Sequence, residues 1–365
     1  MAKLRTSWRR AFPASVLART GIVFGRAVSS KPHGRAIAMT SAANPVLVDV
    51  TRGGIVESFH RGSYAVMDAS GALLASGGTI DEMVFPRSAI KAFQCLPLLE
   101  EGAIEKLGLV AEEIALACSS HSGEARHVGV AESMLRKSGH SAEDLECGAH
   151  WPIAEDAMHE MVKLGQVPSA LHNNCSGKHA GMLALAHLLG APSAGYVEPE
   201  HPVQRRIAKT ISRLCDCDLS KQACGIDGCS VPTWAIPLGN LAAGFARFCT
   251  SENTPAQQII HAVRAHPYLV AGCERFDTLL MRKVPRAFVK TGAEGVYGAC
   301  VPHAGIGIAL KIDDGASRAS QLAIAAVLAK LDVWTESESE QLKELCDGAL
   351  LNRRGIEIGR RRSFY

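Results

Sequence analysis

A serine and a lysine three residues apart, Ser88 and Lys91, are the first residues in the chain whose spacing suggests covalent chemistry. At the start of a helix this spacing places both side chains on one face, within hydrogen-bonding reach. A partly desolvated lysine loses its proton more readily and can then act as the base that activates a serine. Because Ser-x-x-Lys also occurs by chance, a solvated surface pair is the alternative for this motif alone.

Two later segments extend the pair into a recurring arrangement. Ser119 and Ser120 follow the apolar run Ile114–Cys118, predicted as a buried strand, and Lys290-Thr291-Gly292 ends the predicted strand Ala287–Lys290. The order Ser-x-x-Lys, loop serine, Lys-Thr-Gly is that of the penicillin-recognising serine enzymes. There the Lys-Thr-Gly strand can pair with an acyl substrate while its lysine polarises the loop serine. We therefore predict four catalytic residues: Ser88, Lys91, Ser120 and Lys290.

A third cluster has the residue types of a metal site. Cys175, Lys178 and His179 lie at the first turn of a predicted apolar helix, and Asp227 and Cys229 lie in a glycine-rich turn. A helix N-terminus lowers the pKa of a cysteine, which favours metal binding. Two thiolates from separate loops, with a nitrogen or a carboxylate, give a zinc site with an open position. A rival set with less standard spacing comprises Cys215, Cys217, Cys224 and Cys229.

The elements that must position these residues alternate between strands and helices. Strands are predicted at Val46–Val50, in a hairpin of Tyr64–Met67 and Leu73–Ala75, and again at Ile306–Ile312, whereas helical periodicity fills the middle of the chain. This order predicts an α+β fold. A mainly antiparallel sheet is built from both chain ends, with helices packed on it and a helical middle region.

The first part of the 365-residue chain differs in composition from the rest. The first 48 residues contain eight basic residues and no Asp or Glu, a composition typical of transit peptides. Residues 1–44 are therefore predicted to be a disordered extension, or a mis-assigned start with translation beginning at Met39. Residues 45–335 are predicted to form the catalytic domain, and residues 336–365 a C-terminal helix and tail.

Composition excludes several classes of protein. Hydrophobic residues make up 47% and charged residues 21% of the chain, as in a globular protein, and no apolar run is long enough to cross a membrane. Beyond residue 48 there are 31 basic and 36 acidic residues, a net charge of −5, which argues against nucleic acid as a partner. Twelve irregularly spaced cysteines indicate buried thiols in a reducing compartment.

Five motifs occur together over most of the chain. They are Pro86-Arg87-Ser88-Ala89-Ile90-Lys91, Cys118-Ser119-Ser120-His121-Ser122, Asn174-Cys175-Ser176-Gly177-Lys178-His179, Asp227-Gly228-Cys229 and Lys290-Thr291-Gly292-Ala293-Glu294-Gly295. In this combination the chain resembles the rhizobial-type L-asparaginases, the inducible and thermolabile class. The segments 51–58 and 266–272 strengthen the resemblance, which runs from about Val46 to Ile312.

The resemblance implies a fold similar to serine β-lactamases and glutaminases, a homodimer, and hydrolysis of L-asparagine to L-aspartate and ammonia. Ser88 corresponds to the nucleophile, Lys91 to its base, and Ser120 with Lys290 to a second serine–lysine pair. One Zn²⁺ per subunit is expected to help position the substrate, with the ligands Cys175, Lys178 and Cys229. The expected location is the cytoplasm, or the mitochondrion if the N-terminal extension is a genuine leader.

Five residues are predicted to bind substrate: Arg87, Asn174, Gly177, His179 and Asp227. Arg87 could pair with the substrate carboxylate or form a structural ion pair. His179 could contact substrate or face the core. Asp227 is implied to order the zinc site.

Two other functions stay open. A penicillin-binding or β-lactamase-like hydrolase would leave the cysteines and Lys178 unexplained, and a silent zinc-binding protein would not need the four catalytic residues together. Asparagine and glutamine differ by one methylene, worth about 1–3 kcal/mol in a pocket, so the sequence does not choose between them.

Overall fold

The computed structural model describes residues 43–252 and 254–363, which belong to one compact unit. The prediction for residues 1–44 therefore lies outside the described residues, apart from residues 43 and 44. Asn44 is already held by the body of the protein, since its side chain donates to Asp313 and accepts from the backbone amide of Thr79. Within the described ranges, no helix has both the length and the apolar composition needed to cross a membrane.

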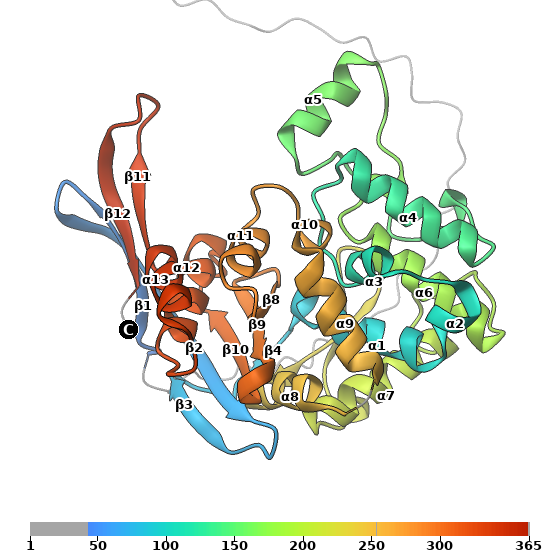
Figure 1. The fold of residues 1–365 in the computed structure, drawn as a ribbon, viewed down its shortest axis with the longest axis horizontal. Helices are drawn as coiled ribbons and strands as arrows, with labels where there is room; N and C mark the ends of the chain where they lie inside the picture. The colour runs from blue at the N-terminus through green and yellow to red at the C-terminus, as the bar shows by residue number, and fades with distance from the viewer. Residues whose placement is uncertain (1–42, 253, 364–365) are drawn as a thin grey trace, which may run out of the picture. The chain divides into compact units, whose positions relative to one another are not determined.

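An antiparallel sheet from both chain ends forms the base of the fold (Figure 1). Its main strands have the spatial order β11–β12–β1–β2–β10–β9–β8, and β3 pairs with β2. Their bounds are β1 (Val46–Arg52), β2 (Ile55–Asp68), β3 (Leu73–Gly77), β8 (Phe288–Thr291), β9 (Val296–Val301), β10 (Ile306–Ile312), β11 (Asp347–Leu351) and β12 (Glu357–Ser363). The predicted fold class and the predicted hairpin between β2 and β3 are confirmed.

Helices cover the central strands on both faces. Every residue of β9 is buried, as is all but one residue of β10, a pattern typical of strands covered on both sides. The helices α8 (Leu238–Thr250) and α12 (Ser317–Ala329) both pack against these two strands. The backbone of α8 packs directly on the backbone of β10 at Gly307, because a Cβ at that residue would lie 2.2 Å from the carbonyl oxygen of Ala242.

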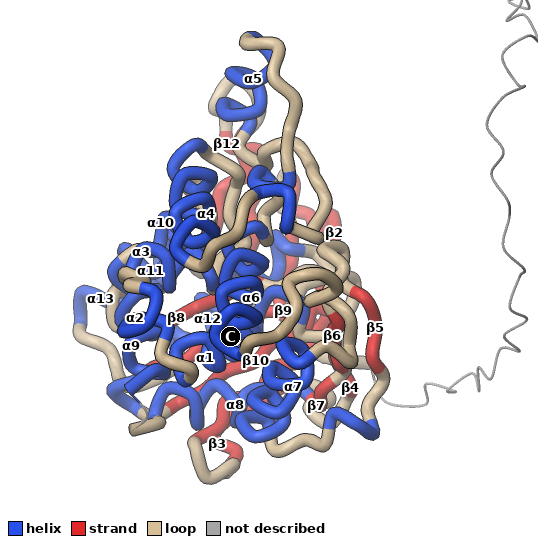
Figure 2. Tube along the Cα trace, turned by 90° about the vertical axis from the view of Figure 1, so that its right-hand side faces the viewer, coloured by secondary structure: helices blue, strands red, loops and turns tan. Residues whose placement is uncertain are grey.

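The middle of the chain is helical, as predicted. Its helices are α1 (Lys91–Glu100), α2 (Ala103–Leu107), α3 (Ala111–Ala117), α4 (Ala125–Lys137), α5 (Glu155–Lys163), α6 (Ser176–Leu189) and α7 (Pro202–Cys215), with α9 (Thr254–Ala265), α10 (Pro267–Val270), α11 (Phe276–Lys283) and α13 (Glu336–Leu345) following later. The α6 helix packs against α1, α3, α4 and α7, which explains its apolar composition on all sides. In contrast, α5 projects beyond its neighbours (Figure 2).

The segment Ile114–Cys118 is not the predicted strand. It belongs to α3 and the turn after it, because the carboxylate of Glu113 accepts a hydrogen bond from the backbone amide of Val110 at 2.9 Å and so caps the first turn. An apolar run this short fits either a buried strand or a buried helix. The loop Ser119–Ser122 therefore follows a helix.

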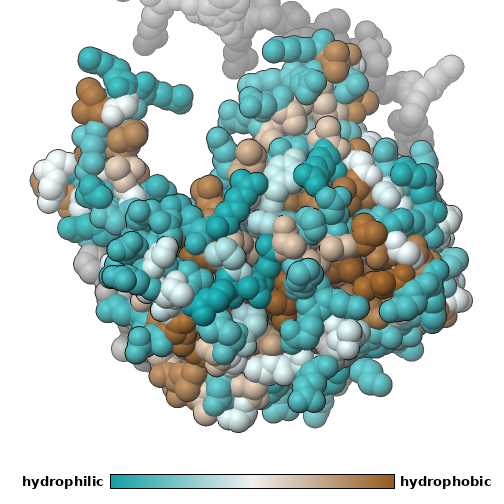
Figure 3. All heavy atoms as spheres, in the orientation of Figure 1, coloured by the Kyte–Doolittle hydropathy of each residue, from teal (hydrophilic) through white to brown (hydrophobic). Residues whose placement is uncertain are grey.

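The C-terminal segment contributes more than a helix and tail. After α13, the strands β11 and β12 form a hairpin, and β12 lies against β1 with Val48 opposite Ser363. The Arg362 guanidinium contacts both carboxylate oxygens of Asp49, at 2.9 and 2.5 Å. Apolar side chains, including Leu351 and Ile356, are exposed on this hairpin, which carries hydrophobic patches in Figure 3.

Short elements complete the fold around the site. Two small sheets pair β4 (Met83–Val84) with β7 (Ile236–Pro237) and β5 (Cys224–Ile226) with β6 (Pro232–Trp234). A 3₁₀ turn, η1 (Arg87–Ile90), leads directly into α1. The motifs predicted from the sequence therefore lie on η1 and α1, on the loop after α3, at the start of α6, after β5 and on β8.

Candidate active site

Ser88 lies in the η1 turn, immediately before α1. The residue before it, Arg87, has φ +51°, a left-handed conformation that costs a non-glycine residue on the order of 1 kcal/mol. The end of β8 presses against this turn, because a Cβ at Gly292 would lie 2.7 Å from the carbonyl oxygen of Pro86. Ser88 is partly exposed, and its hydroxyl has no hydrogen-bond partner among the described residues. The turn thus presents a free hydroxyl beside the strand that carries Lys290.

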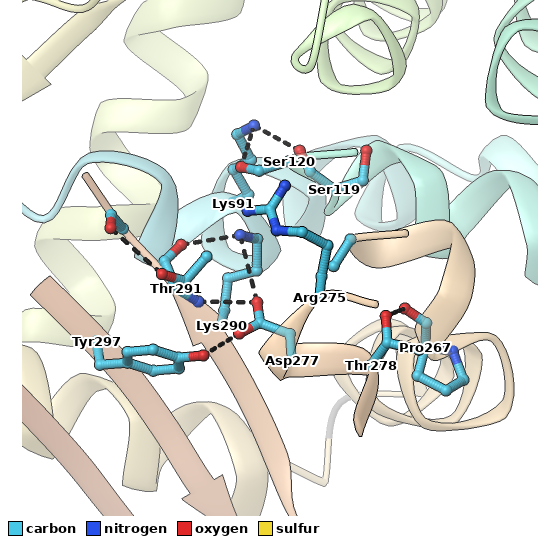
Figure 4. Close-up of polar contacts among 12 residues, drawn as sticks. Lys91, Ser119, Ser120, Pro267, Arg275, Asp277, Thr278, Lys290, Thr291 and Tyr297 are labelled. Carbon is cyan, nitrogen blue, oxygen red and sulfur yellow. Dashed lines mark hydrogen bonds and ion pairs between the residues drawn. The ribbon is translucent and has the colours of Figure 1, made fainter. Parts of the chain in front are cut away.

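Lys91 is buried in a cage of three acceptors. Its ammonium donates to the carbonyl oxygen of Ser119 at 2.5 Å, to the hydroxyl of Ser120 at 2.8 Å and to the sulfur of Cys175 at 3.1 Å. The first two contacts are drawn in Figure 4. Three acceptors match the three N–H groups of a charged lysine. These contacts join the loop after α3 to the start of α6.

Lys290 occupies a different environment at the end of β8. Its ammonium donates to the carbonyl oxygen of Thr291 at 2.8 Å and lies 3.8 Å from the carboxylate of Asp277 (Figure 4). Burial lowers the pKa of Lys290 to about 7; Asp277 opposes this shift, and the charges of Lys91 and Arg275 add to it. A group with this pKa exchanges protons readily near neutral pH.

The predicted serine–lysine pairs are connected differently from the prediction. Ser120 hydrogen-bonds Lys91, and no hydrogen bond joins it to Lys290 within the described ranges. The β8 strand ends at Thr291, and the next residue, Gly292, packs against the η1 turn that carries Ser88. Lys290 therefore lies close in sequence to the point where β8 meets the η1 turn.

The predicted metal ligands lie together in the core. Lys178, in the first turn of α6, donates to the sulfur of Cys229 at 2.9 Å, and Cys175 precedes the same helix. A hydrogen bond from Cys229 holds the pKa of Cys175 well below its usual range, with help from Lys91 and Lys178, while the same hydrogen bond and burial raise the pKa of Cys229. The cluster therefore favours a thiolate at Cys175 and a thiol at Cys229.

Lys178 is charged in this arrangement. Burial opposes its charge, but the two cysteines outweigh burial and raise the pKa of Lys178. A charged amine has no lone pair, so this lysine would have to lose its proton to bind a metal. Two sulfurs and one amine in contact, all buried, fit zinc once that proton is lost. Among the described residues, no three His, Cys, Asp or Glu side chains converge on a possible metal position.

Asp227 and Arg87 form an ion pair beside this cluster. The guanidinium contacts one carboxylate oxygen at 2.7 and 2.9 Å. Burial opposes the charge of Asp227, but the hydrogen bond from Arg87 and the charge of Lys178 lower its pKa. The pair holds the strained Arg87 in place. Because the guanidinium already has a carboxylate partner, it is poorly placed to take a second one from a substrate.

The three other predicted substrate-binding residues have structural contacts. Asn174 donates its backbone amide to His150 at 2.9 Å. A Cβ at Gly177 would lie 2.4 Å from the carbonyl oxygen of Leu116, so this glycine allows α6 to pack against α3. The buried ring of His179 contacts the hydroxyl of Tyr196 at 2.6 Å, and its other nitrogen has no protein partner among the described residues.

A family model for L-asparaginase II matches residues 48–363, nearly all of the described chain. The chain belongs to the L-asparaginase II family. The family indicated by the sequence motifs is therefore confirmed, and membership indicates a hydrolase. No curated protein sequence matches the chain.

Solved structures with a similar fold include two β-lactamases and a synthase. A β-lactamase from Mycobacterium bovis has 13% identity, a TM-score of 0.38 and coverage of 78% of this chain and 95% of its own. A putative β-lactamase from Bacteroides dorei has 12% identity, a TM-score of 0.35 and coverage of 74% and 93%. Simvastatin synthase from Aspergillus terreus has 9% identity, a TM-score of 0.33 and coverage of 78% and 90%.

In this L-asparaginase II family member, three residues of the site were missed by sequence reasoning. Asp277 accepts hydrogen bonds from the backbone amide of Thr291 and the hydroxyl of Tyr297. Arg275, just before α11, extends toward the space between Ser120 and Lys290 (Figure 4). None of the three belongs to a motif of recognisable spacing. The apolar residues of β8 and β9 did indicate that Lys290 lies on a buried strand, where a lysine needs a charged or polar neighbour. They did not indicate which residue that neighbour is.

Proposed function

We propose that the protein hydrolyses L-asparagine to L-aspartate and ammonia through an acyl-enzyme on Ser88. The observation that carries the proposal is the placement of a free serine hydroxyl on a strained turn beside two buried lysines with different surroundings. Family membership supports an amide as the substrate class. The choice of asparagine follows from the sequence resemblance.

The acylation step uses both lysines. Neutral Lys290 takes the proton of Ser88 as the serine oxygen forms a bond to the side-chain amide carbon of the substrate. The carbon–nitrogen bond then breaks, and the leaving nitrogen takes a proton from the hydroxyl of Ser120, which charged Lys91 resupplies. Ammonia leaves, and Ser88 carries the aspartyl ester. In this assignment Lys290 is the base of Ser88 and Lys91 is the partner of Ser120, the reverse of the roles expected from the resemblance. The reason is that Lys91 directs its N–H groups at Ser119, Ser120 and Cys175.

Water reverses these proton transfers in the second step. The attacking water gives its proton to Ser120 and so to Lys91, while Lys290 returns a proton to the oxygen of Ser88 as the ester bond breaks. Both lysines then regain their starting states, so protons balance over the cycle. Backbone amides near Ser88 stabilise the negative oxygen of each tetrahedral intermediate.

We also propose that Cys175, Lys178 and Cys229 hold a zinc ion. Bound zinc would supply a Lewis acid that orients a polar group of the substrate. Asp227 and Arg87 keep the adjoining turn in position. The homodimer and the cytoplasmic location implied by the resemblance stay predictions.

Ammonia release from L-asparagine by the full chain tests the proposal, with L-glutamine in parallel. Ser88→Ala should reduce turnover by at least about 10⁴-fold while the unfolding temperature stays near that of the wild type. Turnover of nitrocefin instead of either amide would favour the β-lactamase-like alternative. Zinc binding without turnover of any of these substrates would favour the silent zinc-binding protein.

A further inference from the structure

Arg275 places a second positive charge beside the reacting groups. It immediately precedes α11, and its side chain extends into the space between Ser120 and Lys290 in Figure 4. Among the described residues, its guanidinium donates a single, long hydrogen bond of 3.5 Å, to the hydroxyl of Ser122. Ser122 lies two residues after Ser120 on the same loop, so Arg275 borders the catalytic loop as well as β8.

This guanidinium has no carboxylate partner in the part of the chain that the structure describes. The nearest acid in sequence, Asp277, is buried and already occupied by Thr291, Tyr297 and Lys290. The contrast with Arg87 is direct, because Arg87 is paired with Asp227 at 2.7 Å. Of the two arginines at the site, Arg275 is therefore the one whose charge is available to a ligand.

Arg275 also lines a cleft of about 620 Å³ that opens beside the catalytic loop. It is the only cation among the described residues that line this cleft. Five carboxylates line it as well, namely Glu124, Glu155, Asp156, Glu160 and Glu274. One cation in an otherwise acidic cleft suits a ligand that carries both charges, and the zwitterion of an α-amino acid is such a ligand.

We propose that Arg275 binds the α-carboxylate of the substrate, at the end of the cleft next to Ser122. This inference rests on the proposed function, since it assumes that the substrate is an amino-acid amide. The planar guanidinium can form two parallel hydrogen bonds to a carboxylate, which fixes the orientation of the substrate as well as its position. For hydrolysis, the side-chain amide must then reach from this end of the cleft to Ser88, past Ser120 on the same loop as Ser122.

The test compares two substrates that differ by one group. L-asparagine carries the α-carboxylate, and 3-aminopropanamide is the same molecule without it. In the full chain, Arg275→Gln should lower kcat/KM for L-asparagine by about 10- to 100-fold, mainly through KM, because a charge-assisted hydrogen-bonded pair is lost. Both substrates are compared at pH 9, where Lys290 is neutral with or without the charge of Arg275. There the same substitution should change kcat/KM for 3-aminopropanamide by less than about 3-fold, since that substrate never makes the pair.

Arg282→Gln is the matched control. It removes an exposed arginine from the same helix and should leave both substrates unaffected. Arg275→Lys should restore part of the activity on L-asparagine, because a lysine keeps the charge without the paired geometry. An equal loss on both substrates in Arg275→Gln, or no loss on L-asparagine, would overturn the proposal.

Failure of the proposed function gives a separate result. If the wild type releases no ammonia from L-asparagine, calorimetric titration with L-aspartate tests Arg275 alone. Binding that weakens about 10-fold or more in Arg275→Gln, but not in Arg282→Gln, would support a carboxylate site in a protein with a different reaction. Equal binding by all three proteins, or no binding by any of them, would overturn the carboxylate site too.

Discussion

Lys91 and Lys290 are each only 1% exposed, yet their neighbours differ, and we propose that Lys91 donates a proton whereas Lys290 accepts one. Lys91 directs its ammonium at a carbonyl, a hydroxyl and a sulfur, which together suit the charged form. Lys290 has one carbonyl at hydrogen-bonding distance and a carboxylate farther away, so burial dominates and its pKa falls to about 7. At equal depth, the two lysines therefore differ in the number of acceptors that their ammonium groups contact.

Of the two lysines, Lys91 should give the larger effect when it is replaced. Lys91→Met should lower kcat by about 10³- to 10⁴-fold, because Ser120 loses its proton source and the buried acceptors lose their donor. It should also lower the unfolding temperature, since an unsatisfied buried polar group costs about 1–3 kcal/mol. Ammonia release and thermal unfolding measure the two effects, and Lys106→Met, at an exposed position, should change neither. Near-normal kcat in Lys91→Met would contradict the role of this lysine.

Lys290 should control the pH dependence of the reaction. The neutral lysine is the reactive form, so kcat/KM of the wild type should rise with pH through about 7. Lys290→Met should lower kcat/KM by about 10²- to 10³-fold and remove that rise. Measurement of kcat/KM between pH 5 and pH 9 checks both statements. The assignment fails if the variant keeps the same acid limb.

Asp277 offers a sharper test, because it changes Lys290 without replacing it. The carboxylate of Asp277 raises the pKa of Lys290, so Asp277→Asn should lower that pKa further. Neutral Lys290 then persists to lower pH, and the acid limb of kcat/KM should move down by about 1 pH unit or more. Tyr297→Phe removes a hydrogen bond to the same carboxylate but keeps its charge, so its acid limb should move much less. A shift to higher pH in Asp277→Asn would contradict the charge argument.

The smallest effect is expected from metal removal. The proposed metal ligand Cys175 accepts a hydrogen bond from Lys91, so the metal would lie on the same side of the site as that lysine. Chelation should raise KM for L-asparagine by about 10-fold or less, because zinc is proposed to position the substrate. Cys229→Ser should reduce the zinc content measured by mass spectrometry, while Cys224→Ser, at an exposed position, should not. Equal zinc content in all three proteins would exclude this ligand set.

The spacing of nearby residues and the order of the elements were sufficient to predict three of the catalytic residues and the antiparallel sheet. Ser88 and Lys91 are three residues apart at a helix start, and Lys290 directly follows the apolar pair Phe288 and Val289 in a strand, so local rules located them. The antiparallel sheet from both chain ends followed from the order of the strands. In each case the deciding information lay within a few neighbouring residues.

Sequence reasoning failed where partners are far apart in the chain or the pattern is polar. The contact of Lys91 with Cys175 spans 84 residues, and that of Arg87 with Asp227 spans 140. The strand Glu357–Ser363 was missed because none of its residues is fully buried and three of its seven residues are arginines. The run Ile114–Cys118 was placed in the wrong class because its apolar residues have no distinguishing period.

The pairing of β12 with β1 also constrains how the chain folds during its synthesis. Strand β1 lies between β2 and β12, so its second edge stays open until residues 357–363 have left the ribosome. At about 5–20 residues per second, that edge waits at least about 15 seconds for its partner. An open strand edge is a template for pairing with other chains. Until β12 is made, the edge of β1 is therefore open to mispairing with other chains.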